Sequence, residues 1–150
     1  MPVSMSKVYI HLIFSTKNRE AWFDSDDIRG ELFKYIGGTL NGLKCPPIKV
    51  GGERDHIHAL FLMNRDDSIS KIVRELKIST SLWFKKTTRR SAFAWQSGYG
   101  VFSVSKSQVE TVIRYINNQA EHHRNKSFQE EFVEFLNAYD AEYDPKYIWE

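Results

Sequence analysis

Short apolar segments alternate with longer segments of helical periodicity along this chain. Residues 8–14 and 56–63 are apolar at almost every position, which is typical of strands buried on both faces. Residues 48–50 predict another short strand, and residues 93–95 and 99–104 predict two more around Gly98 and Gly100. The pattern therefore predicts five strands.

Between and after these strands, apolar residues recur every three or four positions, as on the buried face of a helix. Ser, Asp and Gly residues mark the ends of these segments, because they are good helix caps. The expected helices run from Asp24 or Ser25 to Gly42, from Asp67 or Ser68 to about Thr87, from a capping box at Ser105–Gln108 through Ala120, and from a capping box at Ser127–Glu130 through Tyr139.

The order of the first elements is βαββαββ. Antiparallel strands with helices in their connections predict an α+β sandwich of ferredoxin-like type, with helices on one face of the sheet and further C-terminal helices. No repeat or linker rich in Pro, Gly or Ser divides the chain, so we expect residues 1–150 to form a single domain. Aromatic residues after Ser127 are expected to pack as a clasp on the domain or on a second copy of it.

Composition agrees with one buried core. Of the 150 residues, 41% are hydrophobic and 14% are aromatic, which suffices for a single domain. No apolar run approaches the length of a bilayer span and the N-terminus lacks an export pattern, so we expect a cytoplasmic protein without a membrane partner. Because Cys45 is the one cysteine, a metal site would have to use imidazole and oxygen ligands.

The net charge of +2 is unevenly distributed. Residues 1–120 carry 18 of the 21 basic residues, whereas residues 121–150 carry 8 of the 19 acidic ones. The basic excess therefore lies in the part of the chain that contains His56 and His58, and residues 71–90 alone hold seven basic residues and one acidic residue. Such a density favours a polyanion as partner, although basic residues also decorate ordinary solvated helices.

His56 and His58 form a His-x-His pair within a predicted buried strand. Because side chains alternate between the faces of a strand, the two imidazoles project from the same side and can converge on one metal ion. Two structural imidazoles on a solvated sheet face are the alternative, and they are the commoner case for an isolated pair. His11, in the first strand, is expected to be a structural histidine.

Tyr115 and Gln119 lie one turn apart on the predicted third helix. Relative to the apolar stripe of that helix, Tyr115 lies roughly 120° and Gln119 roughly 80° from its centre, both on one flank. The hydroxyl and the amide can therefore project together into a site, with His122 and His123 nearby. A tyrosine at the edge of the core, with a wet hydroxyl, is the alternative.

Four motifs occur in a fixed order: Phe14-Ser15-Thr16-Lys17-Asn18-Arg19, Asp55-His56-Ile57-His58, Trp95-Gln96-x-Gly98-Tyr99-Gly100-x-Phe102-Ser103 and Tyr115-Ile116-x-x-Gln119. This set resembles the small single-tyrosine HUH transposases of bacterial and archaeal insertion sequences, from about Val8 to the C-terminus. Relatives associated with repeated palindromic (REP) elements share the core but often have asparagine where Asp55 stands, so the mobile-element branch looks closer.

The resemblance implies a metal-dependent transposase that cleaves and rejoins single-stranded DNA through a 5′-phosphotyrosine. It implies Tyr115 as the nucleophile and His56, His58 and Gln119 as ligands of Mg²⁺ or Mn²⁺. The chemistry agrees with this assignment, because a divalent ion neutralises a phosphodiester. A phenol with a pKa of about 10 is also a good enough leaving group to keep the covalent bond reversible.

The resemblance also implies partners. These are single-stranded DNA hairpins at element ends and a second copy of the chain, in a homodimer whose active sites are shared between subunits. Basic residues of the second helix and the following loop are the candidates for contacts with the DNA backbone: Arg74, Lys77, Lys85, Lys86, Arg89 and Arg90.

Other functions remain open at this stage. A non-catalytic nucleic-acid-binding module with an RNA-recognition-like sheet would show the same basic helix, with structural histidines. A domesticated relative acting on repeated palindromic elements would keep the same core. A metal-free phosphoesterase would need two separated His-x-Thr/Ser motifs, which this chain lacks.

Overall fold

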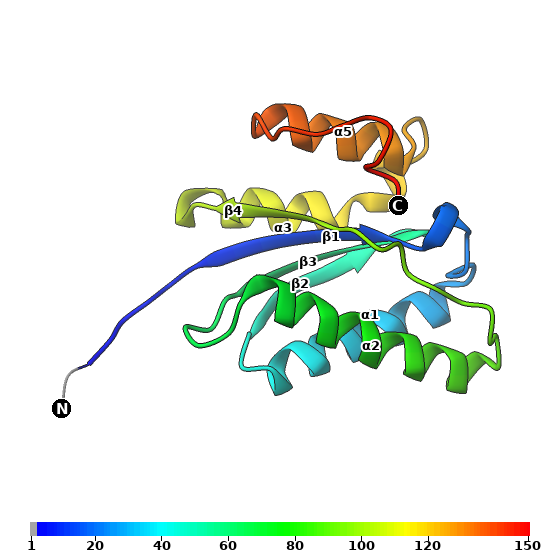
Figure 1. Ribbon diagram of the computed structural model, residues 1–150, viewed down its shortest axis with the longest axis horizontal. Coiled ribbons are helices and arrows are strands. Elements are labelled where there is room, and N and C mark those ends of the chain that lie inside the picture. Colours follow the sequence, from blue (N-terminus) through cyan, green and yellow to red (C-terminus); the bar gives the residue numbers. More distant parts are fainter. Residues whose placement is uncertain (1–2) are drawn as a thin grey trace.

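The computed structural model describes residues 3–150, and an antiparallel sheet of four strands lies at its centre (Figure 1). Strands β1 (Tyr9–Ser15), β2 (Pro47–Gly52), β3 (His56–Leu62) and β4 (Gly100–Val104) are arranged in the order β2-β3-β1-β4. β1 pairs with β3 along its whole length and with β4 on its other side. The predicted α+β fold with an antiparallel sheet is confirmed.

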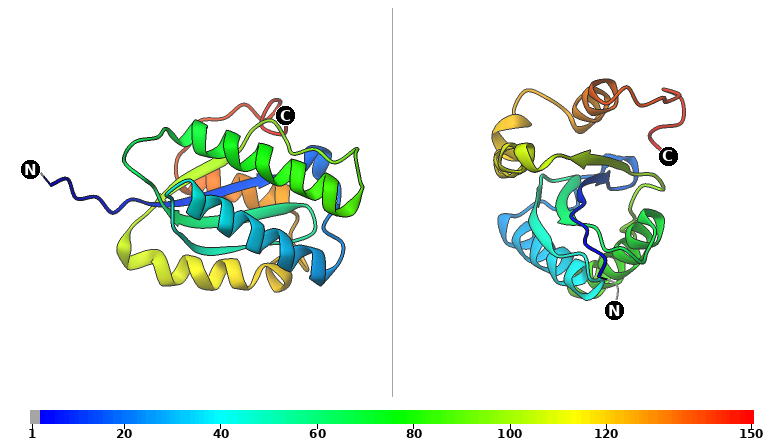
Figure 2. Two further views of the ribbon diagram at one scale, coloured as in Figure 1. Left: turned by 90° about the horizontal axis from the view of Figure 1, so that it is seen from below. Right: turned by 90° about the vertical axis from the view of Figure 1, so that its left-hand side faces the viewer.

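Helices cover both faces of this sheet (Figure 1; Figure 2). Helices α1 (Asp26–Gly42) and α2 (Ile69–Thr88) lie on one face, and α3 (Val109–Asn117), α4 (Gln119–His122) and α5 (Phe128–Ala138) lie on the other. Two short 3-10 helices, η1 (Lys17–Arg19) and η2 (Lys106–Gln108), follow β1 and β4. The sheet is thus the middle of three layers.

Alternate residues of the two central strands face two different cores. Ile10, Leu12 and Phe14 of β1 point toward α1 and α2 and belong to the larger core. Ile13, from the alternate set, packs in a separate cluster with α5. Since both faces are covered, all seven residues of β1 are buried. By the same alternation, the histidines of β3 lie beneath the C-terminal helices.

Residues 93–95 do not form the predicted fifth strand. Trp95 makes only an isolated bridge with Thr16, and the backbone N–H of Ser15 donates instead to the side-chain oxygen of Gln96, at 2.7 Å. The ring of Trp95 packs edge-on against Phe14, with 4.7 Å between centroids. These apolar residues are buried by ring packing, which a hydrophobic pattern cannot distinguish from a strand.

Three of the four expected helix starts are confirmed. The hydroxyls of Ser25, Ser68 and Ser127 each accept a hydrogen bond from a backbone amide in the first turn, and the box at Ser127 is complete. The predicted capping box at Ser105 is wrong, because its hydroxyl is bonded to a neighbouring serine and the 3-10 turn η2 intervenes. Helix α3 begins only at Val109.

The aromatic stripe of α5 packs on the chain's own domain. Phe128, Phe132 and Leu136 are buried against Ile13 of β1 and Phe102 of β4. The tail that follows, with Tyr143, Ile148 and Trp149, covers the outside of this cluster. The cluster and the capping box together hold α5 on the sheet. Within residues 3–150, every helix is too short or too polar to traverse a lipid bilayer.

Gly51 of β2 marks the closest approach between the sheet and α3. A Cβ at this position would lie 2.6 Å from Cγ2 and 3.1 Å from the backbone oxygen of Ile116. We expect Gly51→Ala to lower the free energy of unfolding by about 1–3 kcal/mol, because the overpacked helix must shift. Urea unfolding measures this change.

Gly38→Ala provides the matched control for this substitution. A Cβ at Gly38, within α1, meets no atom within 4 Å, and alanine favours a helix. This variant should therefore be as stable as wild type or more stable. Equal stability of Gly51→Ala and wild type would contradict the close packing of α3.

Candidate active site

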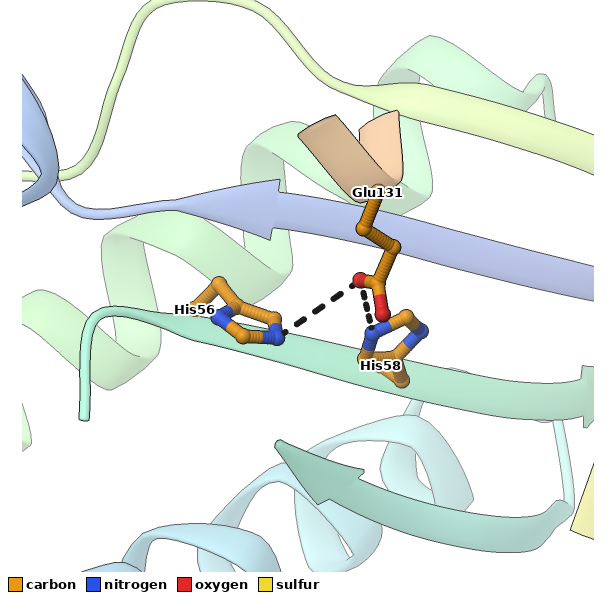
Figure 3. Close-up of side chains that lie close together, drawn as sticks. All are labelled: His56, His58 and Glu131. Atoms are coloured by element: carbon orange, nitrogen blue, oxygen red, sulfur yellow. Dashed lines mark hydrogen bonds and ion pairs between the residues drawn. The ribbon is translucent and has the colours of Figure 1, made fainter. Parts of the chain in front are cut away.

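His56 and His58 lie on the same face of β3, as predicted from the alternation of the strand. Both side chains are completely buried, and their ring centroids lie 5.2 Å apart. Figure 3 shows both imidazoles directed toward the carboxylate of Glu131, which descends from α5. The alternative of two imidazoles on a solvated sheet face is therefore wrong.

Tyr115 and Gln119 reach the same place from the neighbouring helices of the same chain. The ring centroids of Tyr115 and His58 lie 5.7 Å apart, and Oε1 of Gln119 lies 2.9 Å from Nε2 of His56. The expected continuous third helix is interrupted after Asn117, so Gln119 is the first residue of α4. One protomer thus supplies all four predicted site residues.

Glu131 is the central residue that sequence analysis missed. Its side chain is 1% exposed, and its Oε1 accepts a hydrogen bond from Nε2 of His58 at 2.9 Å. Its Oε2 lies 3.0 Å from Nε2 of His123 and 3.1 Å from Nε2 of His122, and it accepts a hydrogen bond from the hydroxyl of Tyr115. A single carboxylate therefore connects three histidines and the tyrosine.

All five histidines of the chain belong to this group. Nε2 of His11 lies 2.8 Å from Nδ1 of His58, so a hydrogen bond from β1 fixes the orientation of the His58 ring on β3. We call this group the histidine–glutamate cluster; it consists of His11, His56, His58, His122, His123 and Glu131. One signal in the sequence could have indicated Glu131, since it is a charged residue on the apolar stripe that Phe128, Phe132 and Phe135 form.

The hydrogen bonds of His56 fit a metal ligand. A carboxylate accepts only, so Nδ1 of His56 must donate to Oδ1 of Asp55, 2.7 Å away. In the neutral imidazole, Nε2 then presents a lone pair to the amide oxygen of Gln119 at 2.9 Å, and two acceptors face each other. A second proton on His56, a half-turn of the Gln119 amide or a cation resolves this contact. A histidine fixed by a carboxylate partner is typical of metal sites.

Burial keeps the supporting imidazoles neutral. Desolvation lowers the pKa of His58 to about 4, against the opposing effect of Glu131, and burial also holds the pKa of His11 well below its usual value. Neutral imidazole is the form that binds metal ions. Burial disfavours the charged form of Glu131 too, but hydrogen bonds from His123 and His58 outweigh this effect and hold its pKa below the usual range.

Tyr115 is held as a neutral phenol. Burial raises its pKa, and the negative charge of Glu131 raises the pKa further. Its hydroxyl also lies 3.0 Å from Nε2 of His122, so the phenolic oxygen has defined neighbours on two sides. In the absence of a cation, this environment disfavours the phenolate.

An open hollow of about 490 Å³ lies beside the cluster. Asp55, His123 and Phe128 line it, together with Glu53 and three basic residues. We call the three basic residues Arg54, Arg124 and Lys126 the hollow's basic rim. Sequence analysis did not single them out, because they are isolated in a chain whose basic residues concentrate elsewhere.

The basic residues of α2 lie across the sheet from the histidines (Figure 1). Arg74, Lys86, Arg89 and Arg90 are exposed, so they present charge to solvent. Lys77 differs, because its ammonium donates to the backbone carbonyls of residues 96 and 98 at 2.8 and 2.7 Å. Burial lowers the pKa of Lys77 to about 8. The basic excess and the histidines share a stretch of sequence but lie on different faces of the protein.

The structure thus defines an α+β protein with a buried polar cluster between one face of its sheet and the C-terminal helices. Its family follows from the sequence. Residues 4–119 match the family model "Transposase IS200 like", and the chain belongs to that family of transposases. The matched region includes Tyr115 and ends at Gln119, before α5.

Two solved structures share the fold. A candidate transposase from Deinococcus radiodurans aligns over 79% of this chain and 95% of its own, with a TM-score of 0.62 and 20% identity. A REP-associated tyrosine transposase bound to a REP hairpin aligns over 83% of this chain and 73% of its own, with a TM-score of 0.60 and 13% identity. No curated protein sequence matches the chain.

The buried neutral imidazoles predict that acid destabilises the metal-free protein. Below pH 6.5 the unfolded chain binds protons at His11 and His58 that the native state does not bind, so stability should fall as the pH falls from 6.5 toward 4. For His58 alone we expect a loss on the order of 1–3 kcal/mol. His123 acts in the opposite direction, because the hydrogen bond and charge of Glu131 outweigh burial and raise its pKa.

Urea unfolding with a chelator at several pH values between 7.5 and 4.5 measures this dependence. His58→Gln should lose less stability over the same range, because one of the three histidines with a lowered pKa is gone. A flat profile would show that folding leaves the pKa values of these imidazoles unchanged, and a native state that becomes more stable in acid would show that folding raises them.

Proposed function

We propose that this transposase cleaves and rejoins single-stranded DNA through a covalent bond between Tyr115 and a 5′ phosphate. The observation that carries the proposal is the convergence of the half-buried Tyr115 with the buried His56, His58 and Gln119, in a chain of the IS200-like family. A non-catalytic RNA-recognition-like module would give no reason for a tyrosine hydroxyl directed into a group of buried imidazoles.

His56, His58 and Gln119 would hold Mg²⁺ or Mn²⁺. When bound, the ion would neutralise the scissile phosphate and polarise it for attack. Asp55 keeps Nε2 of His56 free of a proton. Nε2 of His58 donates to Glu131 in the metal-free protein, so its proton would have to move to Nδ1, which can donate to His11, before Nε2 could bind the ion. Asp55 and His11 therefore orient the two imidazoles in the way that metal binding requires.

Tyr115 supplies the nucleophile in this proposal. Its oxygen forms a bond with phosphorus as the bond from phosphorus to the 3′ oxygen breaks, and the 3′ oxygen takes up a proton. The phenolic proton already has an acceptor in Oε2 of Glu131. Attack of a 3′ hydroxyl on the phosphotyrosine reverses these steps and joins strands, so no nucleotide cofactor is required.

The charge distribution suggests two regions of DNA contact. The basic rim stands at the hollow beside the cluster, where the strand to be cut would enter. The residues predicted from sequence, Arg74, Lys85, Lys86, Arg89 and Arg90, would bind the backbone of the hairpin outside the site, with Lys77 positioning the loop after α2.

We also propose that the protein acts in the cytoplasm, as a single domain, and as a homodimer that brings two element ends together. One chain already contains a complete set of site residues, so the dimer is not needed to assemble the cluster. A second candidate is a relative that processes repeated palindromic elements, which the likeness to the REP-associated transposase favours.

Tyr115→Phe should abolish the covalent adduct with DNA. The test incubates protein and Mn²⁺ with a labelled library of single-stranded hairpins, some of them REP-like, and detects adducts on denaturing gels. Wild type should form an adduct that a chelator prevents. Tyr139→Phe is the control, since Tyr139 is 45% exposed and lies outside the cluster.

Adduct formation by Tyr115→Phe would refute the assignment of the nucleophile. Absence of any adduct with wild type across the library would argue for the binding module instead. Preference for REP-like hairpins would support the second candidate.

Removal of charge from the α2 surface should weaken hairpin binding without changing the cluster. For the triple variant Lys85→Gln, Lys86→Gln and Arg89→Gln, we expect the slope of log affinity against log salt to fall by about one for each phosphate that is no longer neutralised. Fluorescence anisotropy over a salt series measures the slope. Lys34→Gln, an exposed lysine of α1, is the control, and an equal effect of the control would indicate non-specific attraction only.

A further inference from the structure

Glu131 has a place in the cluster that the proposed residues alone do not explain. Two imidazoles and an amide would suffice to hold an ion, yet a fully buried carboxylate lies between them and the tyrosine. It comes from α5, beyond the stretch of chain that matches the family model. An ionised side chain in such a position is costly to bury unless it has a strong partner.

The carboxylate of Glu131 is not free to move away when an ion binds. Its Oε1 lies 2.9 Å from Nε2 of His58 and 3.7 Å from Nε2 of His56, in the space that both imidazoles face (Figure 3). Helix α5 is anchored by its capping box and by the buried rings of Phe128 and Phe132. Glu131 is therefore either a ligand of the ion or an obstacle to it.

The spacing of the atoms favours a ligand. Neighbouring ligands of an octahedral ion with bonds of about 2.0–2.1 Å lie about 3 Å apart, and opposite ones about 4 Å apart. The contact between His58 and Glu131 and the contact between His56 and Gln119 are both 2.9 Å. The 3.7 Å between His56 and Glu131 lies within the same range. These three separations are those of ligands around one ion, and the ligand atoms of His56, His58 and Glu131 all lie within 4.8 Å of one another.

We infer that Glu131, from α5 of the same chain, is a fourth protein ligand of the divalent ion through Oε1, while its Oε2 holds the hydroxyl of Tyr115. This inference rests on the proposed function, because it assumes the ion held by His56, His58 and Gln119. The carboxylate would then link the metal and the nucleophile through one side chain.

A carboxylate ligand has consequences for the choice of metal. Oxygen ligands with negative charge favour Mg²⁺ and Mn²⁺, whereas two imidazoles and an amide would suit several other ions equally well. An intact α5 becomes part of the metal site, and the bound ion ties α5 to β3. Both effects are measurable without DNA.

Glu131→Gln tests the inference through the affinity for Mn²⁺. Electron paramagnetic resonance of free Mn²⁺, with isothermal titration calorimetry, gives the dissociation constant at pH 7.5. We expect Glu131→Gln to bind Mn²⁺ at least about tenfold more weakly than wild type, because the charged ligand is removed while the volume is kept. Circular dichroism of the metal-free variant checks that it folds.

Glu134→Gln is the matched control. Glu134 lies one turn further along α5, loses the same charge, and contacts Lys126 at the surface rather than the cluster. It should bind Mn²⁺ within about twofold of wild type. Equal affinity of Glu131→Gln and wild type would overturn the inference, and so would equal weakening by both variants, which would indicate a general charge effect.

Hydrogen exchange of the wild-type protein provides a test that needs no variant. If Glu131 is a ligand, Mn²⁺ should slow amide exchange in α5 as well as in β3, because the ion connects them. If the ion displaces Glu131, α5 should exchange at the same rate or faster while β3 becomes protected, and the inference fails.

The two proposals fail in different ways. Wild type that binds Mn²⁺ and forms the adduct, together with an unaffected Glu131→Gln variant, removes Glu131 from the metal site and leaves the proposed function intact. Wild type that binds no Mn²⁺ and forms no adduct overturns the proposed function, and the inference with it.

Discussion

One buried carboxylate organises the functional half of this protein. Glu131 accepts hydrogen bonds from β3, α3 and the segment after α4, so these elements converge on its side chain. A negative charge in so dry a position is stable only with several donors around it, and its neighbours are constrained in turn. The orientation of His58, the protonated state of Tyr115 and the position of α5 all follow from this requirement.

The second layer of helices creates the environment in which this interaction is strong. Without α3 to α5, the histidines of β3 would lie on an open sheet face and behave as ordinary solvated imidazoles. Covered by these helices, His11 and His58 lose most of their hydration and stay neutral. The apolar cluster around Phe128 and Phe132 supplies the packing that keeps the cover in place. The strength of the polar contacts on this face therefore depends on the apolar packing that keeps the helices over them.

The same three-layer arrangement places two groups of charged residues on opposite sides of the sheet. The basic residues of α2 lie on the outer layer of one side, and the cluster lies beneath the helices of the other. The hollow and its basic rim lie beside the cluster. In the proposed function, hairpin binding and attack on a strand would therefore take place on different surfaces of the protein.

The sequence by itself determined the four strands that form the sheet, the helix starts at Ser25, Ser68 and Ser127, and the shared face of His56 and His58, because strand alternation, helical periodicity and capping are local properties. It also predicted a fifth strand that ring packing replaces. It also placed Tyr115 and Gln119 on one flank of a helix. In the structure both side chains reach the histidine–glutamate cluster, although the helix breaks between them. Glu131 and the separation of α2 from the histidines came only from the tertiary structure. Which residues meet across the second face depends on how α5 docks, and that packing joins positions more than 70 residues apart, as between His58 and Glu131.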